Sequence, residues 1–238
     1  MSAKGTLYLL PCTLGERDPK DVIPREVFSV ANELEHFIVE DEKSARRFLS
    51  SLGVERPIRE LSFSVFNEQS DISEVAALIQ PLLEGKSVGL LSEAGCPSVA
   101  DPGEEIVREA HRKGIQVKPL VGPCSILLAL IGSGLPAESF SFHGYLPKGE
   151  KEREEKLREL EERARKDSQT QIFMETPYRS AHMLESILKV CRPETELSVC
   201  SELTLKEEEI QTKSIAKWRD SSPKLSKRRC IFLISGIC

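Results

Sequence analysis

A loop rich in glycine, proline and acidic residues follows a short apolar run near the middle of the chain. Residues 92–103 read SEAGCPSVADPG and contain the carboxyl groups of Glu93 and Asp101. Small residues let backbone amides approach a ligand closely, and open α/β sheets bind ligands at the carboxyl ends of their strands. Ordinary strand-to-helix connections are usually about 2–6 residues long. The length and composition therefore favour a ligand-binding loop over a plain connection.

Several well-known catalytic patterns are absent. The chain has no GxGxxG, GxxxxGK[ST] or GxSxG segment, which argues against a nicotinamide dehydrogenase, a P-loop kinase and an α/β-hydrolase. Its four histidines are scattered along the sequence. Its seven cysteines form no CxxC pair, and no histidine lies near enough to complete a zinc pattern. We therefore predict free thiols, no disulfide and no metal.

Short apolar runs alternate with helical patterns through the first half of the chain. This alternation is typical of a parallel sheet with helices packed on both faces. The predicted strands are residues 6–10, 36–40, 58–65, 87–92 and 116–121, and the predicted helices are 22–35, 43–52, 71–84 and 103–113.

Gly122 and Pro123 interrupt this alternation and indicate a domain boundary. The sequence thus predicts an α/β fold with an N-terminal α/β domain over residues 1–121 and a C-terminal one over 122–238. In the second half we predict helices 125–133, 151–167 and 180–190, strands 140–145, 170–175, 196–201 and 229–235, and a helical or irregular stretch at 207–218. The charged helix 151–167 is expected to be mostly solvated.

The bulk composition predicts a soluble, cytoplasmic globular protein. Apolar residues make up 39% and charged residues 30% of the chain. No run approaches the roughly 18–20 apolar residues of a membrane helix, and no secretory signal is visible. The net charge of −5 argues against a general nucleic-acid binder, although a local basic patch can suffice. Basic residues gather near the C-terminus, either as such a patch or to protect an edge strand: Lys224, Lys227, Arg228 and Arg229.

Seven segments, in one order along nearly the whole chain, resemble motifs of one family. GLLSEAGCPSVADPG is similar to the SDAGxPxxSDPG loop of the tetrapyrrole methylase superfamily, and the resemblance is strongest to its ribosomal RNA small-subunit methyltransferase I group. That group methylates a cytidine ribose 2′-hydroxyl. The other matching segments are LYLLPCTLG, VEDEK, KPLVGPCSILLALIGSGLP, FHGYLPKGEKER, QIFMETPYR and CSELTLKEEE.

The resemblance implies a cofactor, its site and an assembly. Members are usually homodimers of two-domain chains that bind S-adenosylmethionine in the cleft between the domains. Carried over position by position, the cofactor-binding residues would be Pro11, Cys12, Ser92, Ala94, Gly95, Cys96, Val99, Cys124, Ser125, Met174, Glu175, Leu203 and Thr204. Apolar side chains such as Val99 and Met174 suit the face of an adenine ring.

The sequence departs from the group's pattern at a few positions. Glu93 stands where the group has aspartate, Lys43 where it has arginine, and Tyr178 where it has histidine. The first loop, PCTLGE, differs from the group's PIGN. The chain ends directly after its last predicted strand and lacks the group's C-terminal extension.

The predicted function is methyl transfer to a ribose hydroxyl of ribosomal RNA in the small ribosomal subunit. A ribose hydroxyl needs help losing its proton. The candidate residues are Glu40, Lys43, Glu93 and Asp101, followed by Glu175 and Glu202. Asp101 has an alternative role as the cap of the helix that begins near residue 103, and Arg179 either contacts RNA phosphate or pairs with a glutamate such as Glu175.

Two other functions stay open at this point. One is a methyltransferase of the same superfamily that acts on a small molecule such as a tetrapyrrole. The other is a module that binds S-adenosylmethionine or RNA without catalysis.

Overall fold

The computed structural model describes residues 3–221, 223, 225 and 227–236. The chain divides into two compact units, residues 1–124 and 125–238. Each unit has its own sheet and its own core, so the two are described separately below.

The first unit contains a five-stranded parallel sheet in the order β3-β2-β4-β1-β5. Its strands are β1 (Thr6–Leu9), β2 (His36–Val39), β3 (Ser62–Val65), β4 (Val88–Leu91) and β5 (Gln116–Pro119). Its helices are α1 (Arg25–Glu33), α2 (Glu42–Leu52), α3 (Val75–Leu78), α4 (Gln80–Leu83) and α5 (Glu104–Arg112). Single 3₁₀ turns cover Pro19–Asp21, Ile58–Glu60 and Ile72–Glu74.

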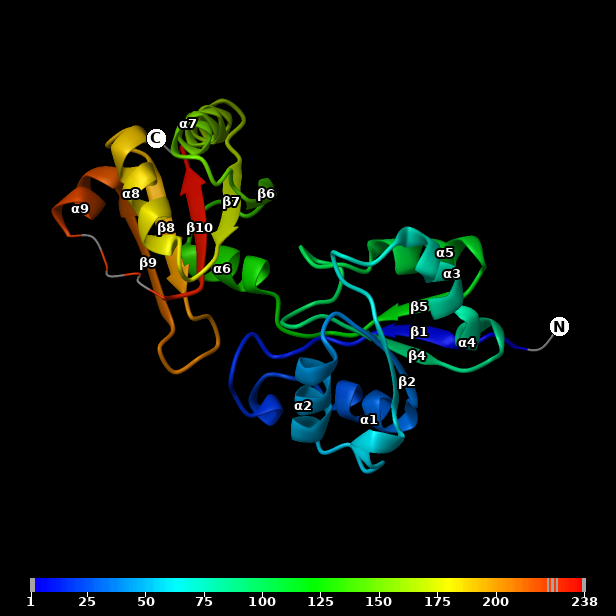
Figure 1. The fold of residues 1–238 in the computed structure, drawn as a ribbon. Coiled ribbons are helices and arrows are strands. Elements are labelled where there is room, and N and C mark those ends of the chain that lie inside the picture. The colour runs from blue at the N-terminus through cyan, green and yellow to red at the C-terminus, as the bar shows by residue number, and fades with distance from the viewer. Residues whose placement is uncertain (1–2, 222, 224, 226, 237–238) are drawn as a thin grey trace. The chain divides into compact units, whose positions relative to one another are not determined.

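Helices cover both faces of this sheet (Figure 1). Side chains of α1 and α2 pack on one face with Leu10, Phe37 and Leu91. Side chains of α3, α4 and α5 pack on the other face with Leu7 and Ile38. All four residues of β4 are buried, as expected for a central strand covered on both sides. The predicted doubly covered parallel sheet is confirmed.

Two predicted elements of this unit are shorter or more broken than expected. The single helix predicted over residues 71–84 is a 3₁₀ turn followed by α3 and α4. Pro81 lies in the first turn of α4, and its missing N–H interrupts a continuous helix. The predicted start signal is confirmed, since Asp71 and Glu74 form a reciprocal capping box. The strand predicted over 58–65 begins only at Ser62, because a 3₁₀ turn precedes it.

The second unit contains a mixed five-stranded sheet in the order β6-β7-β10-β8-β9. Its strands are β6 (Phe140–Tyr145), β7 (Thr170–Glu175), β8 (Glu196–Ser201), β9 (Glu209–Ser214) and β10 (Cys230–Ser235). β6 and β7 are parallel, and the remaining pairs are antiparallel. Its helices are α6 (Ser125–Ser133), α7 (Glu150–Lys166), α8 (Ser180–Val190) and α9 (Ile215–Asp220).

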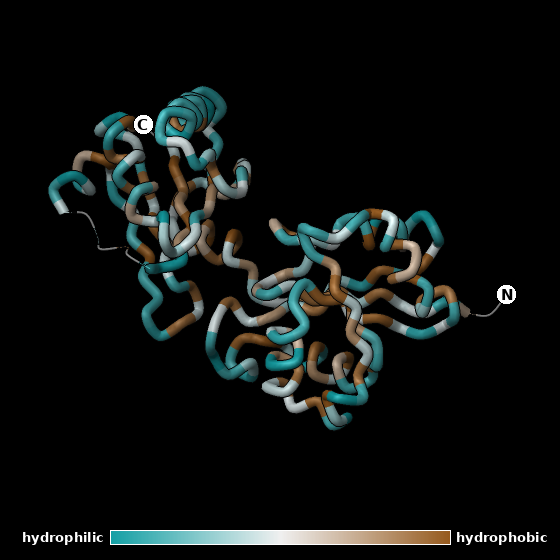
Figure 2. Tube along the Cα trace, in the orientation of Figure 1, coloured by the Kyte–Doolittle hydropathy of each residue, from teal (hydrophilic) through white to brown (hydrophobic). Residues whose placement is uncertain are grey.

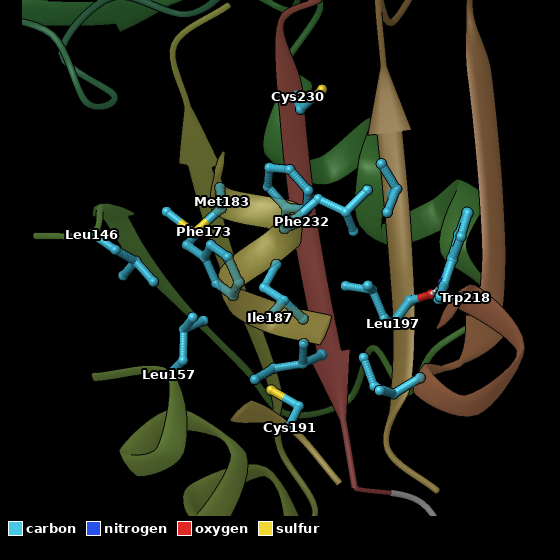
Figure 3. Packing of buried hydrophobic residues seen from close by; sticks show 14 of the residues in the cluster. Leu146, Leu157, Phe173, Met183, Ile187, Cys191, Leu197, Trp218, Cys230 and Phe232 are labelled. Atoms are coloured by element: carbon cyan, nitrogen blue, oxygen red, sulfur yellow. Dashed lines mark hydrogen bonds between the residues drawn. The ribbon is translucent and has the colours of Figure 1, made fainter. Parts of the chain in front are cut away.

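The main core of the second unit lies between the sheet and helices α7, α8 and α9 (Figure 3). Phe173 and Phe232 stack on neighbouring strands with their ring centroids 5.8 Å apart. Trp218 of α9 is buried, and its indole nitrogen donates to the Leu197 carbonyl at 2.9 Å. Helix α6 packs on the opposite face, where the Cys200 thiol lies 3.8 Å from the Ala129 carbonyl oxygen. Apolar residues follow the strands, whereas α7 is mostly hydrophilic (Figure 2).

Two expectations for this unit need correction. The stretch 207–218 contains a strand, β9, before its helix. The basic residues near β10 do not protect an edge strand, because β10 is central in the sheet; Lys224 lies outside the described residues. Most of helix α7 is exposed, as predicted, although the charged residues Arg153, Glu154 and Glu161 are buried. Glu161 accepts hydrogen bonds from the Arg192 amide and the Thr195 hydroxyl at 2.7 and 2.5 Å.

Within the described part of the chain, no helix is both long and apolar enough to span a membrane.

Candidate functional site

Strands β1 and β4 are neighbours in the first sheet, and the strand order reverses between them. The connection after β1 leads to α1 on one face, and the connection after β4 leads to α5 on the other. Two adjacent loops that diverge in this way leave a crevice at the carboxyl ends of their strands, the usual ligand position in open α/β sheets. This edge carries Pro11, Cys12 and the loop 92–103, where most of the predicted cofactor residues lie.

The two loops are joined by a backbone bridge between Cys12 and Gly95. The Cys12 amide donates to the Gly95 carbonyl at 2.8 Å, and the Gly95 amide donates to the Cys12 carbonyl at 3.2 Å. Gly95 has a positive φ of 72°, and a Cβ there would lie 3.1 Å from Leu14. A side chain at this position would be strained and crowded, so the bridge depends on glycine.

Further contacts join the same loops to residues 122–123, near the end of the first unit. The Cys12 thiol donates to the Ser92 carbonyl at 3.2 Å, and the Cys96 sulfur lies 3.5 Å from the Pro123 carbonyl oxygen. Gly122 packs directly on the ring of Pro11, where any Cβ would collide. The first unit therefore brings together its predicted residues from positions 11–12, 92–96 and 124.

The cysteines at this edge are neutral thiols. Burial raises the pKa of Cys12. A hydrogen bond with Cys124, followed by burial, raises the pKa of Cys96. The described cysteines are free, and Cys238 lies outside the described residues. Among the described residues, no group of histidine, cysteine and acidic side chains is arranged to hold a metal ion.

The second half of the loop is held in an uncommon backbone conformation. Ser98 and Ala100 have positive φ angles of 64° and 62°, which cost non-glycine residues free energy and often mark functional sites. Val99, between them, is 42% exposed. The loop thus presents Val99, a predicted adenine contact, as an exposed apolar side chain.

Three of the four leading acid/base candidates gather at this edge, and the fourth does not. A carboxylate oxygen of Glu40 accepts a hydrogen bond from the Glu93 amide at 3.1 Å. Burial raises the pKa of Glu40, with further increases from Asp101 and Glu93. Burial also raises the pKa of Asp101; the Ser92 hydrogen bond opposes this shift, and nearby Glu93 adds to it. Lys43 lies exposed on the first turn of α2 and forms no ion pair with a described residue.

Asp101 does not cap the following helix. The residue at the N-cap of α5 is Gly103, and no side chain caps that helix. The alternative role considered for Asp101 is therefore wrong, and its carboxyl group instead forms a hydrogen bond with the Ser92 side chain.

The predicted residues of the second unit share one edge of their own sheet. β6 and β7 end at this edge, β8 ends beside them, and β10 begins there, since Cys230 pairs with both Glu175 and Ser201. Met174 and Glu175 complete β7, and Leu203 and Thr204 follow β8. Helix α6 begins at Ser125. Its middle contacts Cys200 and its last residue contacts Thr212, so its first residue lies toward the same edge.

Glu175 and Glu202 serve to hold these loops. The Glu175 side chain is fully buried; one oxygen lies 2.8 Å from the Arg179 guanidinium, and the other accepts from the Thr176 amide at 2.7 Å. Glu202 accepts from the Arg229 amide at 2.7 Å and pairs with its guanidinium at 2.9 Å. Both carboxylates are occupied, which makes them weaker acid/base candidates than Asp101. Of the two roles considered for Arg179, the structure places it in the ion pair with Glu175.

Two residues that organise the site were not predicted. Leu14 limits the space beside Gly95, and Glu208 accepts a hydrogen bond from the Thr204 amide at 2.6 Å. Their types carry no local signal, because each acts through a contact that only the folded loops create. Gly122 was interpreted as a boundary, although its close packing on Pro11 gives it a role in the site.

Comparison with known proteins assigns this arrangement to a family. The model of the tetrapyrrole (corrin/porphyrin) methylases matches residues 20–218. The ribosomal RNA small subunit methyltransferase I of Vibrio cholerae is 33% identical over 97% of this chain and 77% of its own length. The protein of that name from Pseudomonas aeruginosa is 31% identical over 99% of this chain and 80% of its own length.

Solved structures share the fold over nearly the whole chain. The methyltransferase CobJ matches with a TM-score of 0.62 at 19% identity, covering 98% of this chain and 94% of that one. The uroporphyrin-III C-methyl transferase of Thermus thermophilus, solved with S-adenyl homocysteine, matches with a TM-score of 0.57 at 16% identity and 98% coverage of both chains. The predicted fold of two α/β domains is confirmed.

Proposed function

Because the chain belongs to the tetrapyrrole methylase family, we propose that it transfers a methyl group from S-adenosylmethionine to a ribose 2′-hydroxyl of ribosomal RNA. The observation that carries the proposal is the Cys12–Gly95 bridge at the point where β1 and β4 diverge. It fixes two loops whose residues match the family's cofactor motifs.

The residues present suit this cofactor. Close backbone approach at Gly95 and Gly122 leaves no room for side chains, so the loops that would contact the cofactor keep a fixed spacing. Val99 and Met174 offer apolar surface for an adenine ring, whereas Leu203 is buried. We propose that Pro11, Cys12, Ser92, Ala94, Gly95, Cys96 and Cys124 of the first unit bind the cofactor, together with Ser125, Glu175 and Thr204 of the second.

The acceptor is inferred from the relatives. Proteins named ribosomal RNA small subunit methyltransferase I are 33% and 31% identical over nearly all of this chain. That likeness supports an acceptor in the small ribosomal subunit. It carries more weight than the likeness to CobJ and to the uroporphyrin-III C-methyl transferase, which are 19% and 16% identical to this chain.

S-adenosylmethionine supplies an already activated methyl group, so the protein must align the reactants and remove one proton. We assign that proton to the Asp101 carboxylate. S-adenosylmethionine, when bound, would supply the methyl group to the ribose oxygen and leave as S-adenosylhomocysteine, and the hydroxyl proton released in this transfer would pass to the Asp101 carboxylate. The raised pKa of Asp101 makes it a better proton acceptor than an ordinary aspartate. We assign Glu40 a positioning role, in which its carboxylate accepts a hydrogen bond from the Glu93 amide of the loop.

We further propose that the protein is a cytoplasmic homodimer. Leu127 and Ile131 lie one helical turn apart on α6 and are 48% and 77% exposed, which leaves an apolar stripe on this helix. Free thiols at every described cysteine are in keeping with a reducing compartment. Light scattering of the purified protein tests the dimer, and a monomeric mass would contradict it.

Transfer of tritiated methyl groups tests the proposed reaction. The purified chain is incubated with labelled S-adenosylmethionine and either small ribosomal subunits, naked ribosomal RNA or a porphyrinogen. Label at a ribose 2′ position supports the proposal. Label in the porphyrinogen alone would overturn the RNA acceptor, and cofactor binding without transfer to any acceptor would indicate a binding module.

A further inference from the structure

Three loops of the second unit meet beside β7. The loop 146–149 follows β6, and the loop 176–179 follows β7. The segment 227–229 precedes β10, which is antiparallel to β7 and therefore begins at the same edge. Met174 and Glu175, proposed above to bind the cofactor, lie at the end of β7 in this position.

Arg179 and Lys227 fasten these loops to one another. The Arg179 guanidinium pairs with the buried Glu175 at 2.8 Å and donates to the Leu146 and Pro147 carbonyls at 3.5 and 3.4 Å. The Lys227 amide donates to the Pro177 carbonyl at 3.1 Å, in a backbone with a positive φ of 62°. Both chain neighbours of Tyr178 are therefore anchored, so the backbone under its side chain is held in place.

The side chain of Tyr178 nevertheless lies in solvent. It is 81% exposed, the largest exposed fraction among the described large hydrophobic residues. An aromatic ring exposed to this degree, on a backbone that is held in place, offers a flat face to a partner. Tyrosine rings in this situation stack on unpaired nucleobases.

Two exposed cations accompany the ring. Lys148 follows Pro147, and Lys227 is hydrogen-bonded through its amide to Pro177; both side chains are exposed. Neither forms an ion pair within the described part of the chain, whereas Arg179, Arg228 and Arg229 are each paired with a glutamate. These two charges are therefore available for phosphate groups.

We propose that Tyr178, Lys148 and Lys227 form a platform that binds single-stranded RNA, with one unpaired base stacked on Tyr178 and the flanking phosphates near the two lysines. This inference rests on the proposed RNA acceptor and adds the form in which the RNA is bound. A base within a duplex is covered by its neighbours and cannot lie on the ring, so the platform selects unpaired nucleotides next to the cofactor residues of β7.

The first test measures binding of a fluorescein-labelled single-stranded RNA dodecamer by anisotropy. Tyr178→Ala should weaken binding on the order of tenfold, in line with the loss of one base–aromatic stack, and Tyr178→Phe should bind as the wild type does. Lys148→Ala and Lys227→Ala should each reduce the slope of log K against log salt by about 0.7. Lys166→Ala is the matched control, because Lys166 is exposed near the opposite end of the sheet, where Arg165 packs on Gly236.

A second test detects directly whether a base stacks on the side chain at position 178. The only native tryptophan, Trp218, is buried, so Tyr178→Trp adds an exposed reporter. Its fluorescence should be quenched by the single-stranded dodecamer and not by the same sequence annealed to its complement. Thermal unfolding of each variant, matched to wild type, checks that the fold is retained.

The outcomes separate this platform from the proposed reaction. Weaker RNA binding by Tyr178→Ala supports the platform even where no methyl group is transferred to ribosomal RNA. Wild-type affinity in Tyr178→Ala, or lysine variants whose salt slope equals that of Lys166→Ala, would overturn the platform even where methyl transfer is intact. A change in molecular mass of Tyr178→Ala with unchanged RNA affinity would assign the ring to contact between two copies and would also overturn it.

Discussion

Cys12 and Gly95 exchange two backbone hydrogen bonds, of 2.8 and 3.2 Å, across the loops that follow β1 and β4. The loops diverge to opposite faces of the sheet immediately beyond this bridge. The bridge therefore fixes the spacing of the crevice into which a cofactor would bind, and it does so without any side-chain chemistry.

Replacing Gly95 tests the bridge. Gly95→Ala places a Cβ at positive φ and 3.1 Å from Leu14, and the left-handed conformation alone costs a non-glycine residue about 1–2 kcal/mol. We expect the affinity for S-adenosylmethionine, measured by calorimetry, to fall by about tenfold or more. Gly53→Ala is the control, since Gly53 has the same φ sign but open space around it. Equal cofactor affinity in both variants would show that the bridge does not shape the site.

Asp101 is predicted to accept the substrate proton. Asp101→Asn should bind the cofactor as wild type does and lose about 10²–10⁴-fold in the rate of methyl transfer. The wild-type rate should rise with pH, with an apparent pKa above that of an ordinary aspartate, because burial raises the pKa of Asp101. Transfer by Asp101→Asn at the wild-type rate would remove Asp101 from the mechanism.

The ionised carboxylate of Glu40 is predicted to destabilise the folded protein at neutral pH. Its pKa is raised in the folded state, chiefly by burial, so the folded protein binds the proton more tightly than the unfolded chain does. Stability from this group is present at low pH and is lost as pH rises through the folded pKa. Glu40→Gln keeps an acceptor for the Glu93 amide and removes the charge. Its melting temperature should exceed that of wild type at pH 7, and the gain should vanish near pH 4; a lower melting temperature at pH 7 would contradict this assignment.

The buried ion pair of Glu175 and Arg179 should contribute strongly to stability. Arg179→Ala leaves a fully buried carboxylate without its counterion, and such a loss costs about 3 kcal/mol or more. The control is Arg163→Ala, which removes a partner from the exposed pair with Glu159, also spaced four residues apart, and should cost under about 1 kcal/mol. Denaturant unfolding measures both. Similar losses of unfolding free energy in the two variants would mean that the Glu175 carboxylate is solvated.

The cysteines should react slowly with thiol reagents in the folded state. The pKa values of Cys191, Cys200 and Cys230 are raised to about 12, 11 and 11, mainly by burial. At pH 7.5 an aromatic disulfide reagent should titrate few thiols in native protein and all seven in denaturant. Fewer than seven thiols after unfolding would reveal a disulfide.

Much of the fold was predictable because its signals are local. The apolar runs that became β1, β2 and β4 are short, β4 is buried throughout, and the capping residues Asp71 and Glu74 act within one turn. The strand β9 was missed because Glu209–Ser214 reads as polar. It lies at the edge of the sheet, where burial is incomplete and the apolar alternation fades.

The sequence motifs predicted which segments form the site, but they did not predict which residues contact one another there. The loop 92–103 has a composition that stands out in the sequence, whereas the partners of its residues come from distant positions. Neither the hydrogen bond from the Glu93 amide to Glu40 nor the packing of Gly122 on Pro11 has a local signature. For the same reason the buried Glu161 of α7 could not be distinguished from its solvated neighbours.

The central claim is tested most directly by mapping the methyl group. Small ribosomal subunits that lack this modification are incubated with the protein and labelled S-adenosylmethionine, and the RNA is digested and analysed by mass spectrometry. We expect one added methyl group on a ribose 2′-oxygen, lost with Asp101→Asn and strongly reduced with Gly95→Ala. A methyl group on a base, or no methylated nucleotide despite confirmed cofactor binding, would contradict it.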